Sequence, residues 1–170
     1  MNKSAEIAVP AAGTGQRPAP QRRTLLAWLP TLVWIVVLAL FSTDTFSAEH
    51  TGGILLKIIH AVYGPISQQR FEEIHLLVRK GAHFFGYGLL SALAFFSWHA
   101  TVASIERWSF RCTALALGLT LLVASSDEFH QSFVPSRTST PRDVALDMVG
   151  ALCFQLVIAA WVRSRKPQAP

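Results

Sequence analysis

Two long apolar runs, Cys112–Ser125 and Val144–Val162, border a stretch of the chain that is rich in charge. This stretch, Ser126–Gly150, holds four carboxylates, two arginines and one histidine. Neither run reaches the roughly 20 residues needed to cross a bilayer unless it includes some of these charged positions. We therefore expect the charges at the edge of a membrane, where they are costly and indicate a functional site. The alternative is a solvated turn whose charged residues only cap helices and pair with each other.

The composition favours a polytopic membrane protein. Of 170 residues, 51% are hydrophobic and only 15% charged, which is too few charges for a soluble chain with such apolar runs. The net charge of +5 is compatible with nucleic-acid binding, but the basic residues lie at the flanks of the apolar runs. That distribution is typical of topology control and of contact with anionic lipid headgroups. We therefore expect membrane lipids, and no nucleic acid, as partners.

The apolar runs predict an all-α polytopic helical bundle with about four transmembrane helices. The expected spans are residues 25–41, 82–98, 112–129 and 144–162. After the first span, Ile54–Tyr63 is predicted to be a short interfacial helix, and Ser67 to cap a separate helix, Gln68–Lys80. We interpret these two helices as a lid on the outer surface of the bundle. A dedicated cap that contacts a ligand is the alternative.

The chain divides into one transmembrane domain and two tails. Residues 1–23 contain three prolines and two glycines, together with Gln, Ala and Ser, without an apolar period, which predicts a disordered cytoplasmic tail. Residues 24–163 form the predicted transmembrane domain, and residues 164–170 a second cytoplasmic tail. The first apolar run begins too late for a signal peptide, so we expect a retained span. The two cysteines, Cys112 and Cys153, fall at different expected depths, so no disulfide is predicted.

A few residues predict how the helices pack. Trp34 lies deep in the first span, where we expect it to contact another helix. Gly88 and Ser91 belong to a small-residue face on the second span that lets a neighbour approach closely, and Ala114 and Gly118 form such a pair on the third.

The distribution of Lys and Arg predicts the orientation. With four spans, the N-terminus, the 105–111 turn and the C-terminus share one side and carry nine of the fifteen basic residues, against six on the other side. The positive-inside rule then places both termini in the cytoplasm of a multi-pass membrane protein. The charged stretch faces outward.

Four spans also bring the start of the second, the end of the third and the start of the fourth to one membrane face. The helical period of 3.6 residues places their polar residues on common stripes. Pro135 and Pro141 restrict the loop that carries Arg137, which can pair bidentately with carboxylates. The predicted ligand-binding residues are Lys80, His83, Tyr87, Asp127, Glu128, Gln131, Arg137, Asp143 and Asp147.

The spacing on the third span places both of its acids in this site. Asp127 and Gln131 are four residues apart, and Glu128 and Gln131 are three apart, so either acid can share a face with the amide. On the fourth span, Asp143 and Asp147 share a face, with Asp147 one turn deeper.

Three chemistries suit these residue types. A metal site would use His83 or His130 with two or three carboxylates, but no compact ligand motif such as HExxH is present. General acid–base catalysis would use Asp127 or Glu128, with a pKa raised by burial beside another carboxylate. The third chemistry is binding, in which an arginine and its carboxylate partners recognise a headgroup or peptide that carries both charges. We favour binding, and expect no metal and no cofactor.

Two motifs carry a resemblance to a known family and together cover roughly residues 79–151. The first motif consists of Arg79, Lys80, Ala82, His83, Phe84, Tyr87 and Leu90, and the second of Asp127, Glu128, Gln131, Phe133, Pro135, Arg137, Asp143, Asp147 and Gly150. This pattern resembles the VanZ-like family of small bacterial membrane proteins. The resemblance implies a polytopic helical protein, and the family is named for its association with resistance to teicoplanin-type glycopeptide antibiotics.

The resemblance indicates a location and a site more than a reaction. We expect an integral protein of the bacterial cell membrane whose outward-facing polar cluster binds an envelope component, either a lipid headgroup or a cell-wall precursor. In this interpretation Arg137 binds the anionic group of the ligand. The alternative is a membrane-embedded hydrolase or transferase that uses Asp127 or Glu128 as general base.

Overall fold

The computed structural model describes residues 20–43, 48–102, 108–134 and 140–164, and within these ranges the chain is helical without any strand. This confirms the predicted all-α class. Most of the two predicted tails, residues 1–19 and 165–170, lies outside the described residues, whereas residues 20–23, predicted to be disordered, are helical, and residue 164 is also helical. The helices are α1 (Pro20–Ser42), α2 (Ala48–Tyr63), α3 (Gln68–Thr101), α4 (Phe110–Gln131) and α5 (Pro141–Ser164).

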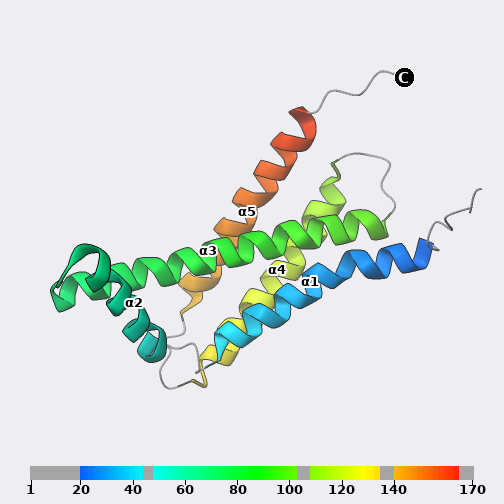
Figure 1. Ribbon diagram of the computed structural model, residues 1–170. Helices are drawn as coiled ribbons and strands as arrows, with labels where there is room; N and C mark the ends of the chain where they lie inside the picture. Colours follow the sequence, from blue (N-terminus) through cyan, green and yellow to red (C-terminus); the bar gives the residue numbers. More distant parts are fainter. Residues whose placement is uncertain (1–19, 44–47, 103–107, 135–139, 165–170) are drawn as a thin grey trace, which may run out of the picture.

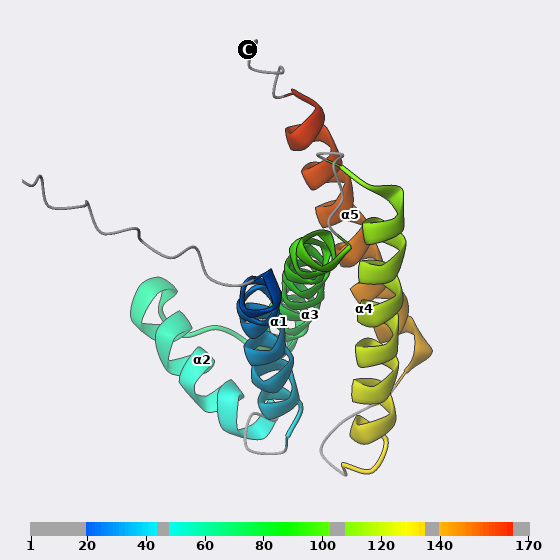
Figure 2. The same ribbon diagram turned by 90° about the vertical axis from the view of Figure 1, so that its right-hand side faces the viewer.

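The central element is α3. The helices α1, α4 and α5 pack against its second half, while its first half extends beyond them with α2 beside it (Figure 1, Figure 2). In the second half, Tyr87, Leu90, Ala94 and Phe95 are at most 2% exposed. This face of α3 is therefore held against the neighbouring helices.

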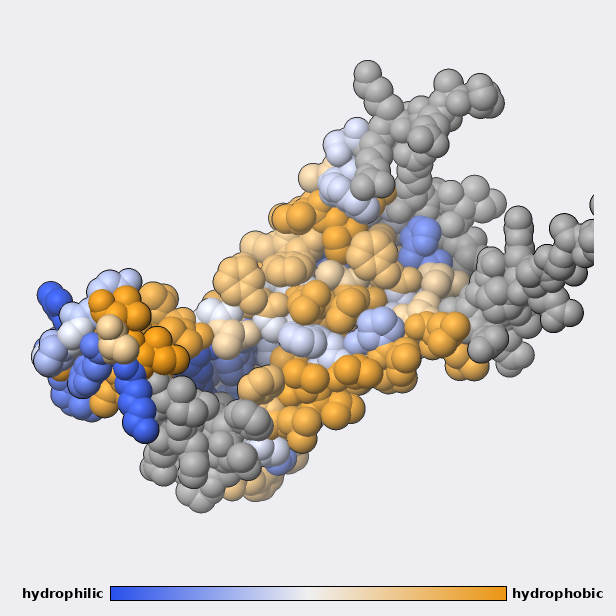
Figure 3. All heavy atoms as spheres, in the orientation of Figure 1, coloured by the Kyte–Doolittle hydropathy of each residue, from blue (hydrophilic) through white to orange (hydrophobic). Residues whose placement is uncertain are grey.

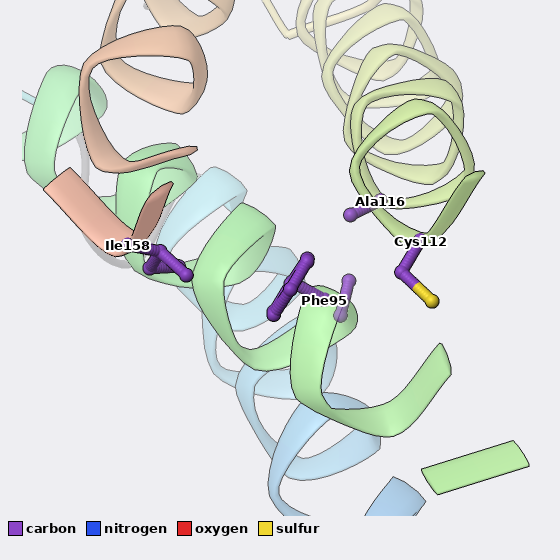
Figure 4. Close-up of a cluster of buried hydrophobic side chains, with 5 residues drawn as sticks. Phe95, Cys112, Ala116 and Ile158 are labelled. Carbon is purple, nitrogen blue, oxygen red and sulfur yellow. The ribbon is translucent and has the colours of Figure 1, made fainter. Parts of the chain in front are cut away.

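Apolar side chains pack together near the end of α3. Phe95 of α3 lies between Ile158 of α5 and the pair Cys112 and Ala116 of α4 (Figure 4). These side chains are buried, with Ile158 the most exposed at 8%. The cluster joins three helices into one body.

Close packing between α3 and α5 depends on glycines and on one amide. A Cβ atom at Gly88 would collide with the side chain of Phe154, and one at Gly150 would collide with the backbone of α3. About one turn after Gly88 on α3, Ser91 accepts hydrogen bonds from the Gln155 amide at its carbonyl and its hydroxyl oxygen, both at 2.9 Å. The predicted small-residue face at Gly88 and Ser91 is thus confirmed.

The predicted packing pair on α4 is wrong. Ala114 and Gly118 are exposed, and a Cβ atom at Gly118 would meet no atom within 4 Å. The inward face of α4 carries instead Cys112, Ala116 and Thr120, each fully buried and four residues from the next. Because α4 is apolar on all sides, its sequence does not single out the face that packs.

The predicted boundary between a lid helix ending at Lys80 and a span beginning at Ala82 is also wrong. One helix runs from Gln68 through Gly81 to Thr101. A single glycine costs a helix only about 1 kcal/mol relative to alanine, and no proline follows to end the helix. The predicted cap is confirmed, because the Ser67 hydroxyl accepts a hydrogen bond from the Arg70 amide at 3.4 Å.

Helices long and apolar enough to cross a membrane number three in the described part of the chain: Thr24–Ser42, Phe110–Gln131 and Pro141–Ser164. The part of α3 that contains the expected span, residues 82–98, is not among them. Its polar residues, such as His83, Ser91 and Ser97, lower its hydropathy, but Ser91 and Ser97 are fully buried. Large apolar side chains cover much of the outer surface of α1, α4 and α5, and hydrophilic residues gather where α3 begins (Figure 3).

Candidate functional site

A cavity of about 530 Å³ lies between α1, α2 and the middle of α3, and the last turns of α4 complete its wall. Most of its surface is apolar, with Trp34, Leu38 and Phe41 on α1 and Val78 and Phe85 on α3. We call it the α1–α3 cavity. Its size and apolar lining are in the usual range for a small-molecule site.

Trp34 shapes the apolar side of this cavity. Its indole nitrogen donates a hydrogen bond to the carbonyl oxygen of Gly86 at 2.9 Å, which holds α1 against α3. This confirms the expected contact of Trp34 with another helix. Because the bond fixes the ring, one of the walls of the cavity is rigid.

The polar part of the lining comes from one stripe of α3 and one of α4. On α3, Arg79, His83 and Tyr87 follow one another at intervals of four residues and all line the cavity. On α4, Asp127 and Gln131 are also four apart and line it too. We call these five residues the polar wall.

Hydrogen bonds connect most of the polar wall. One carboxylate oxygen of Asp127, Oδ2, accepts from the Tyr87 hydroxyl at 2.7 Å and from the Gln131 amide at 2.9 Å. The guanidinium of Arg79 donates in turn to the amide oxygen of Gln131 at 3.5 Å. Gln131 is 1% exposed and stands between the cation and the carboxylate.

His83 connects the polar wall to α5. Its Nδ1 atom lies 3.2 Å from Oδ1 of Asp147, which is buried behind the wall with its side chain 2% exposed. The ring of His83 also stacks on Tyr87, with the ring centres 6.0 Å apart. A carboxylate bonded to Nδ1 fixes the orientation of the imidazole ring. The other ring nitrogen, Nε2, is then the one left for a ligand.

The structure brings together five of the nine predicted site residues. Tyr87, His83, Asp127 and Gln131 line the cavity, and Asp147 contacts His83. Three others, Lys80, Glu128 and Asp143, do not join them. Arg137 lies outside the described residues, and the positions of the other three follow from their local contacts.

Glu128, Lys80 and Asp143 lie away from the cavity. The carboxylate of Glu128 is buried and accepts a hydrogen bond from the backbone amide of Thr140, so it joins α4 to the start of α5. Lys80 is exposed on the outer side of α3. Asp143 stands in the first turn of α5, where a negative charge is favourable to the helix dipole.

The prediction missed Arg79 as a site residue and chose its neighbour Lys80. The choice depended on whether α3 is continuous. In one unbroken helix, Arg79 precedes His83 by four residues and shares its stripe, whereas Lys80 is turned away by about 100°. The spacing of Arg79, His83 and Tyr87 was therefore visible in the sequence.

The described residues contain no group of three or more His, Cys, Asp or Glu side chains that could hold a metal ion. His130, the other histidine considered for such a site, lies near Ser42 of α1, with Nδ1 3.4 Å from the hydroxyl oxygen. The arrangement suits another chemistry. An apolar cavity with hydrogen-bonding groups and one cation along a single wall can hold an amphiphile and orient its polar end.

The sequence profile of one family, described as VanZ/LLP1, matches residues 26–162, and so includes the polar wall, Asp147 and nearly all of the three apolar spans. Neither a curated protein nor a solved structure matches the chain. The profile extends well beyond the two motifs on which the resemblance depended. With its apolar helices and this match over most of its length, the chain is a membrane protein that belongs to the VanZ/LLP1 family.

Proposed function

We propose that this protein binds an amphiphilic component of the cell envelope in the α1–α3 cavity, either a membrane lipid or a lipid-linked cell-wall precursor. One observation carries the proposal: a single cavity of about 530 Å³ combines apolar walls with a hydrogen-bonded polar wall. An amphiphile needs both surfaces at once, whereas a soluble polar metabolite would leave the apolar walls without contacts. If the ligand is a cell-wall precursor, this binding would connect the chain with the teicoplanin resistance that the family resemblance implies.

The proposal includes four spans, with the second half of α3 as the fourth. Figure 1 supports this: the end of α1, the end of α4 and the start of α5 lie near one another, and α1 and α4 begin, and α3 and α5 end, on the other side of the molecule. The buried serines of α3 are paired with other helices, so its polar residues do not prevent a central span. The bias of basic residues then places both termini in the cytoplasm and the polar wall near the outer leaflet.

A bulky residue inside the cavity tests the proposal. Ala82 lines the cavity, and Ala82→Trp would fill much of the space that an acyl chain needs. Ala114→Trp is the matched control, because Ala114 is exposed on α4 outside the cavity. Native mass spectrometry of the full chain, purified from membranes in a mild detergent, should detect a bound amphiphile in the wild type and in Ala114→Trp. The adduct should be absent from Ala82→Trp. Equal retention by both variants would show that the cavity is not the binding site.

A hydrolase or transferase is the second candidate, and the contact between His83 and Asp147 favours it. A histidine that a buried carboxylate orients beside a cavity is a common general base. Asp127 lines the same cavity, whereas Glu128 does not, which leaves Asp127 as the better placed of the two acids considered from sequence.

Substitution of these groups separates the two candidates. If the protein is an enzyme, incubation with total envelope lipids should change one lipid species, and Asp127→Asn should slow this change while the lipid still binds. If the protein is a binder, no species changes in either form and Asp127→Asn alters affinity alone. Mass spectrometry of the lipid extract, with Glu128→Gln as the comparison outside the cavity, distinguishes these results.

A further inference from the structure

Arg79 places a cation in a mostly apolar cavity. Within the described residues, the one ion pair closer than 4.0 Å is that of His83 with Asp147, so no carboxylate oxygen lies that close to the Arg79 guanidinium. The guanidinium donates one long hydrogen bond, at 3.5 Å, to the neutral amide oxygen of Gln131. A guanidinium has five N–H donors, and most of those of Arg79 are therefore available to a ligand.

The depth of Arg79 indicates which anion it would meet. Arg79 lies one turn before His83, where α3 leaves the first half that projects beyond the other helices and enters the apolar bundle. In the four-span arrangement this is the level of the lipid headgroups, and the anions at that level are lipid phosphates. The planar fork of a guanidinium matches two phosphate oxygens at once.

The opening of the cavity indicates where the ligand comes from. Phe41, Val78 and Phe85 line the cavity and are also 53%, 50% and 62% exposed, so the rim on the side of α1 and α3 is apolar and continues onto the outer surface. In a bilayer this rim faces acyl chains. A lipid can move into the cavity sideways from the membrane, whereas a free phosphate ion would have to cross an apolar rim.

Asp127 limits the charge that the site accepts. Its carboxylate stands behind Gln131, and the two donors that it receives, from Tyr87 and Gln131, are neutral. A ligand bound to Arg79 therefore lies near a negative charge. This favours an anion with one negative charge, such as a phosphodiester, over a doubly charged one.

We propose, as a refinement that rests on the proposed function, that Arg79 binds the phosphate group of a membrane phospholipid whose acyl chain occupies the apolar part of the α1–α3 cavity. Gln131 holds the guanidinium and the Asp127 carboxylate on its two sides. The polar wall thus recognises the headgroup through Arg79, and the apolar walls accept the chain.

Single-chain lipids of one acyl length test this proposal with the full chain in a neutral detergent. The probes are lysophosphatidylglycerol, which carries a phosphodiester, and monoacylglycerol, which is neutral; apparent Kd values come from native mass spectrometry. The wild type should bind the phosphodiester about tenfold or more tightly than monoacylglycerol, as a charge-assisted hydrogen bond implies. Arg79→Gln should remove this preference and leave the Kd for monoacylglycerol unchanged.

Controls separate this site from general attraction between charges. Arg142→Gln removes an exposed cation near the start of α5, outside the cavity, and should leave both Kd values unchanged. Inorganic phosphate should not compete with the lysolipid at comparable concentration, and a fatty acid should bind more weakly than the phosphodiester. Competition by phosphate, stronger binding of the fatty acid, or an equal effect of Arg79→Gln and Arg142→Gln would each overturn the proposal.

The same measurements separate a failure of this inference from a failure of the proposed function. If monoacylglycerol and the lysolipid bind equally, and Ala82→Trp blocks both, the cavity binds amphiphiles but Arg79 does not recognise phosphate. If neither lipid binds the wild type, the proposed function fails together with the inference.

Discussion

Asp127 accepts two hydrogen bonds at one oxygen atom, from the hydroxyl of Tyr87 on α3 and the amide of Gln131 on its own helix. Tyr87 is 2% exposed, so its hydroxyl has no access to bulk water. A buried donor that bonds a carboxylate contributes more than one that bonds a neutral group. The bond from Tyr87 is therefore expected to hold α3 against α4 as well as to shape the cavity.

Tyr87→Phe should lower the free energy of unfolding by about 1.5–3 kcal/mol, because it removes a hydrogen bond to a charged group and leaves the carboxylate with one donor fewer. Tyr63→Phe is the matched control, since Tyr63 is 81% exposed and its change should stay within about 0.5 kcal/mol. Reversible unfolding in mixed micelles measures both. Equal stability of the two variants would mean that the hydroxyl of Tyr87 contributes nothing to the fold.

The same residues show how far a site can be predicted from sequence. Periodicity placed Asp127 and Glu128 each within reach of Gln131, but successive residues of a helix point about 100° apart, so only one of them could face α3. The rotation of α4 decides between them, and that rotation depends on packing between helices. The structure places Asp127 at the cavity and Glu128 at the backbone of Thr140.

At the scale of helices, the contact between α3 and α5 is the closest in the bundle. Gly150 of α5 lies directly against the backbone of Phe84, one residue after His83, and Asp147 is one turn earlier on α5. Because membrane helices pack through close contact of small residues, this glycine sets the distance between the two helices. It therefore also sets the contact of His83 with Asp147.

Gly150→Ala should destabilise the fold by about 1–3 kcal/mol, because the added methyl group would collide with backbone atoms that cannot rotate away. Gly118→Ala makes the same change on α4 where no atom lies within 4 Å, and should leave stability unchanged or slightly raised. Unfolding in mixed micelles again provides the measurement. A loss in Gly118→Ala as large as that in Gly150→Ala would contradict the packing described here.

The long apolar runs were sufficient to predict helices. They were not sufficient to predict where each helix ends or which of its faces packs against a neighbour. The expected break near Lys80 depended on a change from mixed to apolar composition, but composition does not end a helix, and the chain has no proline between Ser67 and Thr101. Glycines on α3 and α4 look alike in sequence, yet Gly88 packs tightly and Gly118 faces open space. Only the arrangement of neighbouring helices distinguishes them.

At the scale of the whole molecule, alternating helix directions bring four chain segments to the level of the polar wall. These are the end of α1, the middle of α3, the end of α4 and the start of α5 (Figure 1). The segments are distant in sequence, which is why one motif alone does not define the site. Connectivity of a helical hairpin bundle was sufficient to predict that His83, Asp127 and Asp147 would meet.

This arrangement predicts which residues share a side of the membrane. In a variant with Cys112→Ala and Cys153→Ala, single cysteines at Lys80 and Arg142 should react with a membrane-impermeant maleimide added to intact cells. Cysteines at Arg111, in the first turn of α4, and at Arg163, in the last turn of α5, should react only after the membrane is permeabilised. All four positions are exposed, so differences in labelling report on sidedness and not on burial.

The labelling pattern tests two statements separately. If positions 111 and 163 react in intact cells and positions 80 and 142 react only after permeabilisation, the four spans are correct and the orientation is inverted. The orientation is the separate statement, because it depends on an excess of basic residues of only nine to six. If positions 80 and 142 react from different sides, α3 and α5 cannot present His83 and Asp147 at one depth. A bundle of four spans would then be impossible, and so would the contact of His83 with Asp147 beside the α1–α3 cavity.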